Sequence, residues 1–294
     1  MQTRLPALLV AIFVLAPPAP ADDGHALPLW QVNGTRNRVY LLGSIHLLRE
    51  QDHPLPAAIY AAYDDAESLV MELDMDDMDP VEGQVLTNEL GLIKDGRELK
   101  DLMGSDHYAE AEQLAVAAQV PLALLANAEP WFAAMNVEIM LLMRMGFNPA
   151  LGVDTHFAEL AKADDKEIAG LESLRQQLEF LDGLSARAQR DMLLQALAEG
   201  ADLQESMDDV IDAWKNGDVA YLEKNLLAEM EDYAELNQVI VVDRNLAWSD
   251  RIEAMLEDGD DYLVVVGTLH LVGDDGLPNL LKSRGYDVVQ LRAQ

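Results

Sequence analysis

The chain has 294 residues, and its 53 acidic against 20 basic side chains give a formal net charge of −33. A surface this negative repels nucleic acid and anionic lipid, so we expect neither as a partner, and acidic residues at this density also keep a protein in solution. The sequence contains no cysteine, which excludes disulfide bonds and thiol nucleophiles.

The first 21 residues have the composition of a secretory signal peptide. Met1–Arg4 carries a positive charge, Leu5–Ala16 is apolar, and Ala19–Ala21 forms an Ala-x-Ala cleavage site. The apolar run is too short to cross a bilayer, although a retained membrane anchor is the alternative interpretation. We therefore predict cleavage after Ala21 and a single-domain mature chain, residues 22–294, that is periplasmic or secreted and has no transmembrane anchor.

The first strands are predicted near the start of the mature chain. Leu29–Leu48 is expected to form a hairpin, because an Asn-Gly turn at Asn33-Gly34 separates two apolar runs. The second run leads into the motif Gly43–His46. Ser68–Leu73 is the next predicted strand and carries Glu72 near its end. A carboxylate in that position is costly to bury unless it is paired or coordinated.

Residues from about 80 to 250 are predicted to form a long, mainly helical insert, because apolar residues recur there at spacings of three and four. A short strand is expected within it at Glu167–Glu172. Leu236–Trp248 is a predicted helix that carries Arg244-Asn245. In that apolar setting the guanidinium would either form an ion pair with a carboxylate or point at a developing oxyanion.

The pattern of the first Gly-x-x-His motif recurs near the C-terminus. Leu263–Val266 is apolar and mostly β-branched, as in a strand buried on both faces, and it leads into Gly267–His270. Tyr286–Leu291 is the last predicted strand. We therefore predict an α/β fold with an α+β-like arrangement, in which a central mixed sheet forms from both ends of the chain and the helical insert covers it.

The two Gly-x-x-His motifs define the candidate site. Ligands of open α/β sheets bind at the carboxyl ends of strands, so we expect His46 and His270 to meet there beside Glu72. Gly43 and Gly267 would leave room above the sheet edge. Imidazole serves as a general base or as a metal ligand near neutral pH. Because the sequence has no Walker loop, nucleophile elbow or H-E-x-x-H helix, water activation is the chemistry that these residues favour.

With these residues the chain resembles the TraB/PrgY/GumN family, which includes the Tiki metalloproteases, and it is most similar to the bacterial GumN-type branch. The matching motifs run in order along the mature chain. They are Gly43-Ser44-Ile45-His46, Glu72, Gly152-Val153-Asp154, Gly170-Leu171-Glu172 with Gln177, Arg244-Asn245, Gly267–Gly273 and Gly285–Val288. Asp154 is expected only to cap the helix that follows it.

The resemblance implies a fold shared with ChaN-like and erythromycin-esterase-like proteins. The site that it implies consists of His46, Glu72, Arg244 and His270. In the Tiki branch such a site is similar to that of a metal-dependent protease using manganese or cobalt. In the esterase-like relatives a histidine activates water without a metal.

We expect an exported hydrolase that acts on a peptide or an ester. In the metal-dependent, peptidase-like form, His46, Glu72 and His270 would bind a divalent ion (manganese, cobalt, zinc or iron). Arg244 would stabilise the oxyanion, with Glu172 and Asn245 as supporting partners. A metal-independent, esterase-like hydrolase is one alternative. The other is a non-catalytic periplasmic protein that binds a metal, haem or a peptide signal.

Overall fold

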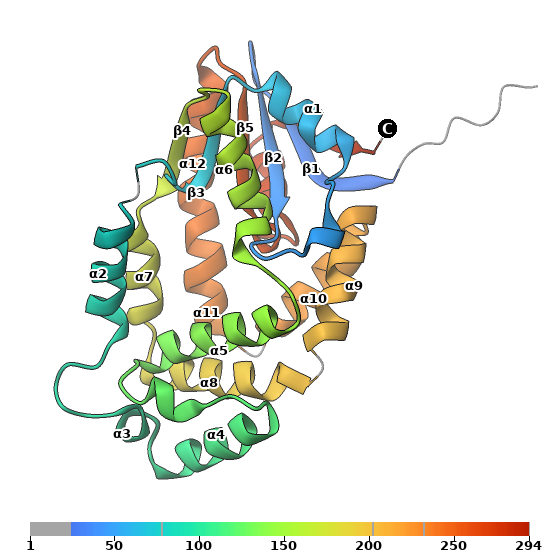
Figure 1. Ribbon diagram of the computed structural model, residues 1–294. Coiled ribbons are helices and arrows are strands. Elements are labelled where there is room, and N and C mark those ends of the chain that lie inside the picture. Colours follow the sequence, from blue (N-terminus) through green and yellow to red (C-terminus); the bar gives the residue numbers. More distant parts are fainter. Residues whose placement is uncertain (1–24, 78, 202, 232, 294) are drawn as a thin grey trace, which may run out of the picture.

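The chain is built around one six-stranded sheet, drawn in the computed structural model of Figure 1. The structure describes residues 25–77, 79–201, 203–231 and 233–293, so the predicted signal peptide, residues 1–21, lies outside the described residues. The strand order is β4-β3-β5-β2-β1-β6. The strands are β1 Ala26–Asn33, β2 Arg38–Ser44, β3 Ser68–Leu73, β4 Ile168–Glu172, β5 Tyr262–Gly267 and β6 Asp287–Arg292.

The directions of the strands determine where the site forms. Strands β4, β3, β5 and β2 run parallel to one another, whereas β1 is antiparallel to both β2 and β6. The carboxyl ends of the four parallel neighbours therefore meet at one edge of the sheet. The predicted hairpin is present, but Asn33 pairs with Arg38, so its loop is residues 34–37 rather than a turn at residues 33–34.

The helices lie around this sheet. They are α1 Ala57–Asp65, α2 Pro80–Gly91, α3 Leu99–Met103, α4 Ser105–Ala117, α5 Pro130–Arg144, α6 Val153–Ala163, α7 Leu174–Asp182, α8 Ala186–Ala198, α9 Leu203–Asn216, α10 Val219–Glu231, α11 Ala234–Asn237, α12 Asp243–Glu257 and α13 Leu277–Ser283. A π-helical turn, Gln238–Val242, joins α11 to α12. In the part of the chain that the structure describes, no helix has the length and apolar character needed to span a bilayer.

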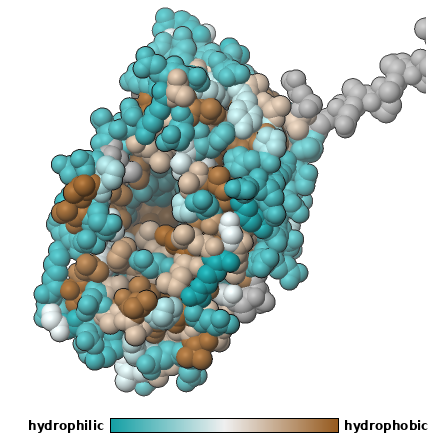
Figure 2. Space-filling view, in the orientation of Figure 1, coloured by the Kyte–Doolittle hydropathy of each residue, from teal (hydrophilic) through white to brown (hydrophobic). Residues whose placement is uncertain are grey.

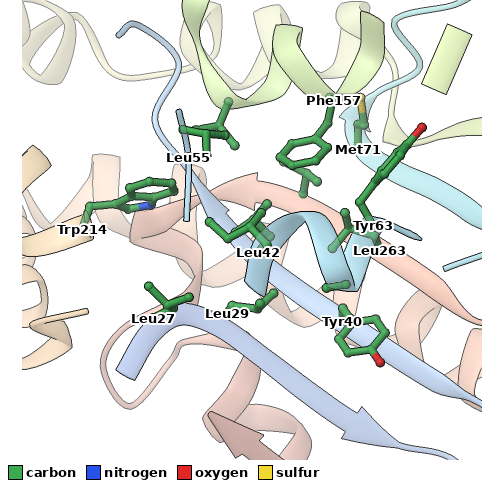
Figure 3. Close-up of a cluster of buried hydrophobic side chains, with 14 of the residues drawn as sticks. Leu27, Leu29, Tyr40, Leu42, Leu55, Tyr63, Met71, Phe157, Trp214 and Leu263 are labelled. Atoms are coloured by element: carbon green, nitrogen blue, oxygen red, sulfur yellow. The ribbon is translucent and has the colours of Figure 1, made fainter. Parts of the chain in front are cut away.

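Alternating strand residues bury two apolar faces, as period-two side-chain placement requires. On one face the strands pack against α1, α6 and α9 (Figure 3). On the other face they pack against Trp248 and Ile252 of α12 and Leu281 of α13. Leu263–Val266 has no exposed surface, which confirms the strand predicted to be buried on both faces. Each fully buried large aliphatic side chain contributes roughly 1.5–3 kcal/mol.

The helical insert covers the sheet only in part. Helices α3, α4, α5 and α8 pack around an apolar cluster of their own and lie below the sheet in Figure 1. Its buried members include Leu99, Met103, Val137, Leu141 and Leu193. The α/β fold with a central mixed sheet is confirmed. The prediction that the central helices cover the sheet is wrong for this group, because their apolar faces contact one another.

Candidate functional site

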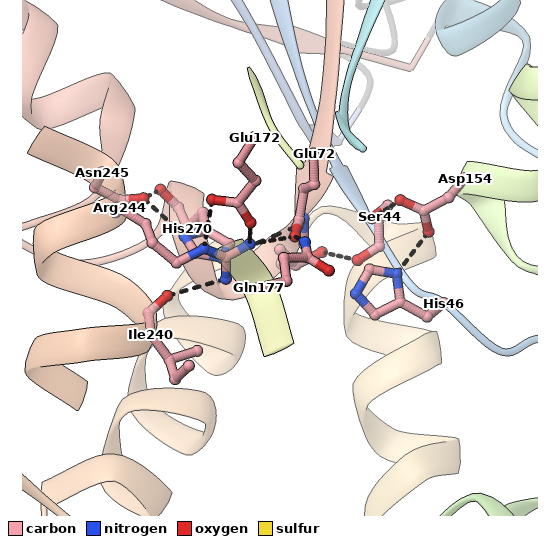
Figure 4. A network of polar contacts seen from close by, with 12 residues as sticks. Ser44, His46, Glu72, Asp154, Glu172, Gln177, Ile240, Arg244, Asn245 and His270 are labelled. Atoms are coloured by element: carbon pink, nitrogen blue, oxygen red, sulfur yellow. Dashed lines mark hydrogen bonds and ion pairs between the residues drawn. The ribbon is translucent and has the colours of Figure 1, made fainter. Parts of the chain in front are cut away.

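The predicted site residues follow neighbouring strands. His46 comes just after β2, Glu72 lies near the end of β3, and Glu172 ends β4. Gly267 ends β5, and His270 lies in the short 3₁₀ helix that follows it. Because these four strands are parallel neighbours, their ends bring together side chains that are far apart in sequence (Figure 4).

Arg244, in the first turn of α12, lies at the centre of the buried half of this cluster, and 7% of its side chain is exposed. All five of its N–H groups have acceptors. Nη2 donates to Glu72 Oε2 and Glu172 Oε1, both at 2.6 Å, and Nε donates to Glu172 Oε2 at 3.2 Å. Nη1 donates at 3.1 Å to the carbonyl of Ile240 and to Nε2 of His270. The guanidinium therefore has no N–H left for an oxyanion, and this geometry gives Arg244 a positioning role.

Glu72 is ionised although it is buried. Burial by itself disfavours the charged form, but the permanent charge of Arg244, the charge of His46 and the N–H of Gly267 hold the pKa of Glu72 below its ordinary value. The N–H of Gly267 donates to Oε1 at 2.8 Å, and the amide of Gln177 donates to Oε2 at 3.0 Å. Glu72 is therefore fixed from three elements besides its own strand.

His270 is held as a neutral ring. The Asn245 amide donates to the carbonyls of His270 and Asp275, so its Oδ1 faces His270 Nδ1 at 2.7 Å and accepts the Nδ1 proton. The lone pair of Nε2 then accepts from Arg244. Burial lowers the pKa of His270 to about 3, and the nearby guanidinium acts in the same direction.

His46 belongs to a second, open half of the site. Its Nδ1 lies 2.8 Å from Oδ2 of Asp154, and the hydroxyl of Ser44 donates to Oδ1 of the same carboxylate at 2.8 Å. Sixty per cent of the His46 side chain is accessible to solvent. The negative charge of Asp154 is the main cause that raises the pKa of His46 to about 9.

Gly267 leaves space at the meeting point of the two halves. A Cβ atom there would lie 3.4 Å from Glu72 Oε1 and 3.7 Å from His46 Nε2, so both atoms face the gap that the missing side chain creates. A cavity of about 320 Å³ opens beside it and is lined by residues that include His46, Glu72, Asp154 and Gln177. Among the described residues, no group is hydrogen-bonded to His46 Nε2. A reacting molecule can therefore reach this nitrogen.

The predicted metal ligands fit a metal ion only in part. His46 Nε2 and Glu72 Oε1 converge over Gly267, as two donors of a metal site would. The lone pair of His270 Nε2 is used by Arg244, whose charge 3.1 Å away would repel a divalent cation. In the described ranges, no group of three or more histidine and carboxylate side chains is arranged to hold a metal ion. The metal site stays a prediction.

The other predicted residues support the same cluster. A Cβ on Gly43 would lie 2.9 Å from Thr268 Oγ1, so glycine permits the close approach of the two Gly-x-x-His turns. The sequence predicts only a helix-capping role for Asp154. It follows the N-cap residue Gly152 in the first turn of α6, and its carboxylate faces His46 instead.

Sequence reasoning missed the pairing of Asp154 with His46 and that of Gln177 with Glu72. Both Asp154 and Gln177 occur in the motifs that carry the family resemblance. That occurrence is the one signal that points to them, because neither lies close in sequence to its partner.

Comparison with known proteins agrees with this resemblance. The model of the TraB/PrgY/gumN family matches residues 28–290 of the chain. The uncharacterized protein YbaP of Escherichia coli strain K12 is 25% identical over 246 residues, which cover 83% of this chain and 87% of that protein. YbaP of Shigella flexneri gives the same values. No solved structure matches the chain significantly.

Replacing Arg244 with alanine is expected to lower the free energy of unfolding by about 3–5 kcal/mol, because Glu72 and Glu172 remain buried without their counter-ion. Arg244→Lys should recover only part of this loss, since an ammonium cannot reproduce the planar fork of a guanidinium. Urea denaturation followed by circular dichroism measures both variants. Arg187→Ala, which removes an exposed ion pair with Asp191, is the control and should cost less than about 1 kcal/mol. Equal losses would contradict the assigned role.

His46 is expected to titrate near pH 9, and Asp154→Asn should bring its pKa back toward the ordinary value of about 6.5. NMR titration of the imidazole signals measures this, with His46→Gln to assign the resonance. Because the folded-state pKa is raised, the pair stabilises the fold fully below a pH of about 6.5 and loses this effect as the pH rises through about 9. Asp154→Asn should therefore be more destabilising in mildly acidic than in alkaline buffer. An unshifted His46 in the wild type would refute the pairing.

Proposed function

Since the chain belongs to the TraB/PrgY/gumN family, we propose that it is a hydrolase in which His46 activates water for attack on the carbonyl carbon of a peptide or an ester. One observation carries the proposal: Asp154 holds Nδ1 of His46, and Nε2 faces an open cavity. A base oriented by a carboxylate is the arrangement that general-base hydrolysis requires. The proposal includes export through the predicted signal peptide.

The proposed reaction uses the open half of the site. Nε2 of His46 removes a proton from a water molecule in the cavity, and the water oxygen attacks the carbonyl carbon. The imidazolium that forms is stabilised by Asp154 and by the nearby charge of Glu72. When the tetrahedral intermediate breaks down, His46 returns the proton to the leaving nitrogen or oxygen. The bond between the carbonyl carbon and the leaving group breaks in this step.

The buried half of the site positions these groups. Arg244 holds Glu72 and Glu172 in place, and Glu72 accepts from the backbone of Gly267 below the gap. The positive charge of Arg244 is compensated by two carboxylates. We therefore assign transition-state stabilisation to the His46 imidazolium rather than to Arg244.

His46→Ala is expected to reduce hydrolysis about 10²–10⁴-fold, the usual contribution of a general base. A library of p-nitrophenyl esters and fluorogenic peptides, assayed from a pH of about 9 upward, where deprotonated His46 becomes the major form, provides the measurement. Glu110→Gln, a substitution of an exposed residue on α4, is the control. Hydrolysis that is retained in His46→Ala would contradict the mechanism. Ligand binding without turnover by the wild type would favour the non-catalytic binder.

Chelation distinguishes the two hydrolytic schemes. Because the lone pair of His270 is used by Arg244, we expect hydrolysis to persist after treatment with EDTA and gel filtration. Elemental mass spectrometry of the same samples, beside His46→Ala and His270→Ala, measures bound manganese, cobalt, zinc or iron. Activity that disappears on chelation and returns with one of these ions would favour the metal-dependent, peptidase-like scheme instead.

A further inference from the structure

The cavity beside His46 has a polar and an apolar wall. Figure 2 shows that the molecule is hollowed on this face, and the hollow lies between the positions of α6 and α7 in Figure 1. The end of β3, the 3₁₀ turn Pro149–Leu151 and these two helices supply most of the lining. Its polar members are His46, Glu72, Asp154, Thr155 and Gln177, and its apolar members are Met71, Leu73, Met75 and Pro149.

The apolar wall results from the side-chain alternation of β3. Successive strand side chains point to opposite faces, so Met71 and Leu73 share one face, and the alternation of apolar with acidic residues continues to Met75 beyond the strand end. Met71 is buried, whereas Leu73 and Met75 are half-buried. Leu73 is packed against none of the apolar clusters that the described residues form. The strand therefore carries apolar surface past the edge of the core and into the cavity.

The charges of the lining are compensated. The carboxylate of Asp154 is paired with His46, and that of Glu72 is paired with Arg244. The described lining contains neither lysine nor arginine. A charged side chain that entered the cavity would therefore meet no group that lacks a counter-ion, and it would lose its hydration without compensation.

The uncharged polar groups of the lining also have partners. The hydroxyl of Thr155 donates to the carbonyl of Pro149 at 3.0 Å. The amide of Gln177 donates to Glu72 at 3.0 Å, which holds Gln177 at the end of the cavity where Nε2 of His46 faces Gly267. The polar end of the cavity is therefore the reacting end, and the wall formed by β3 has no polar side chain to offer a substrate.

We propose that this cavity binds an aliphatic side chain directly next to the reacting carbonyl, so that Leu73 and Met75 determine specificity. The inference rests on the proposed hydrolase function for its reaction but not for its binding chemistry. The apolar wall would remove the methylene groups of the side chain from water. A polar side chain would lose hydrogen bonds to water that this wall cannot replace. Because His46 lines the same cavity, a substrate bound in this way has its carbonyl beside the base.

Binding is tested without hydrolysis, at a pH of about 7, where protonated His46 cannot act as the base. The probes are N-acetyl-norleucinamide and N-acetyl-glutaminamide, whose side chains are of similar length, and ligand-observed NMR titration gives their dissociation constants. We expect the norleucine probe to bind about tenfold more tightly, because the glutamine side chain loses its hydrogen bonds to water. The norleucine probe should also shift the methyl NMR signal of Met75, which Met75→Leu assigns.

Two matched variants locate the preference. Met75→Gln keeps the length of the side chain but makes the wall polar, and it should remove most of the preference for norleucine. Met143→Gln makes the same change at an exposed position of α5 outside the lining, and it should leave the preference unchanged. Thermal melting checks that both variants fold. If Met75→Gln unfolds, Leu73→Gln replaces it and should have the same effect.

Equal affinity for the two probes would overturn the pocket. A preference that is fully retained in Met75→Gln, or in Leu73→Gln where that variant replaces it, would overturn it as well. Binding of the norleucine probe that leaves the methyl signal of Met75 unshifted would place the probe elsewhere and would have the same consequence.

Hydrolysis separates this inference from the proposed function. Peptides that differ only by norleucine or glutamine at the residue whose carbonyl reacts are compared by kcat/KM, at a pH of about 9 or above. A preference of about tenfold for norleucine that falls in Met75→Gln supports the pocket. Hydrolysis that depends on His46 but does not distinguish the two peptides overturns the pocket alone. Selective binding of the norleucine probe without hydrolysis of any peptide supports the pocket and refutes the hydrolase.

Discussion

The guanidinium of Arg244 is the group on which the arrangement of the site depends. Its N–H groups reach Glu72 on β3, Glu172 on β4, His270 after β5 and the carbonyl of Ile240 in the π-helical turn. Without it, two buried carboxylates would face each other in a medium that screens poorly. Buried ion pairs seldom stabilise a fold more than apolar packing does. The contribution of this network is therefore positional: it fixes where the strand ends lie.

Because every N–H group of Arg244 has an acceptor, the two halves of the site have different roles. In the buried half, Arg244, Glu72 and His270 already have partners for the groups that could react, and the ring of His270 is held neutral. In the open half, His46 is held through one nitrogen by Asp154 and exposes the other. Preorganised catalytic sites combine residues that are rigidly held by their partners with a base that is free to react. Proton transfer is therefore assigned to His46.

The sequence allowed the strands and their endings to be predicted, because buried parallel strands are continuous apolar runs and the glycine-histidine turns follow them directly. It did not allow the pairing of His46 with Asp154 to be predicted, since the two lie 108 positions apart and an aspartate at a helix start is equally typical of a cap. That all five N–H groups of Arg244 have acceptors could not be predicted either, because it depends on the order of β4, β3 and β5 in the sheet. The separate packing of α3, α4, α5 and α8 was missed because amphipathic periodicity shows that a face is buried but not against what.

The charges of the site are divided between its two halves. His46 carries the positive charge that can offset an oxyanion, whereas the enclosed carboxylates of Glu72 and Glu172 are compensated by Arg244. The strongly acidic composition of the chain therefore matters for function where its carboxylates are enclosed, as at Glu72 and Glu172, because exposed acidic residues are screened by solvent and salt.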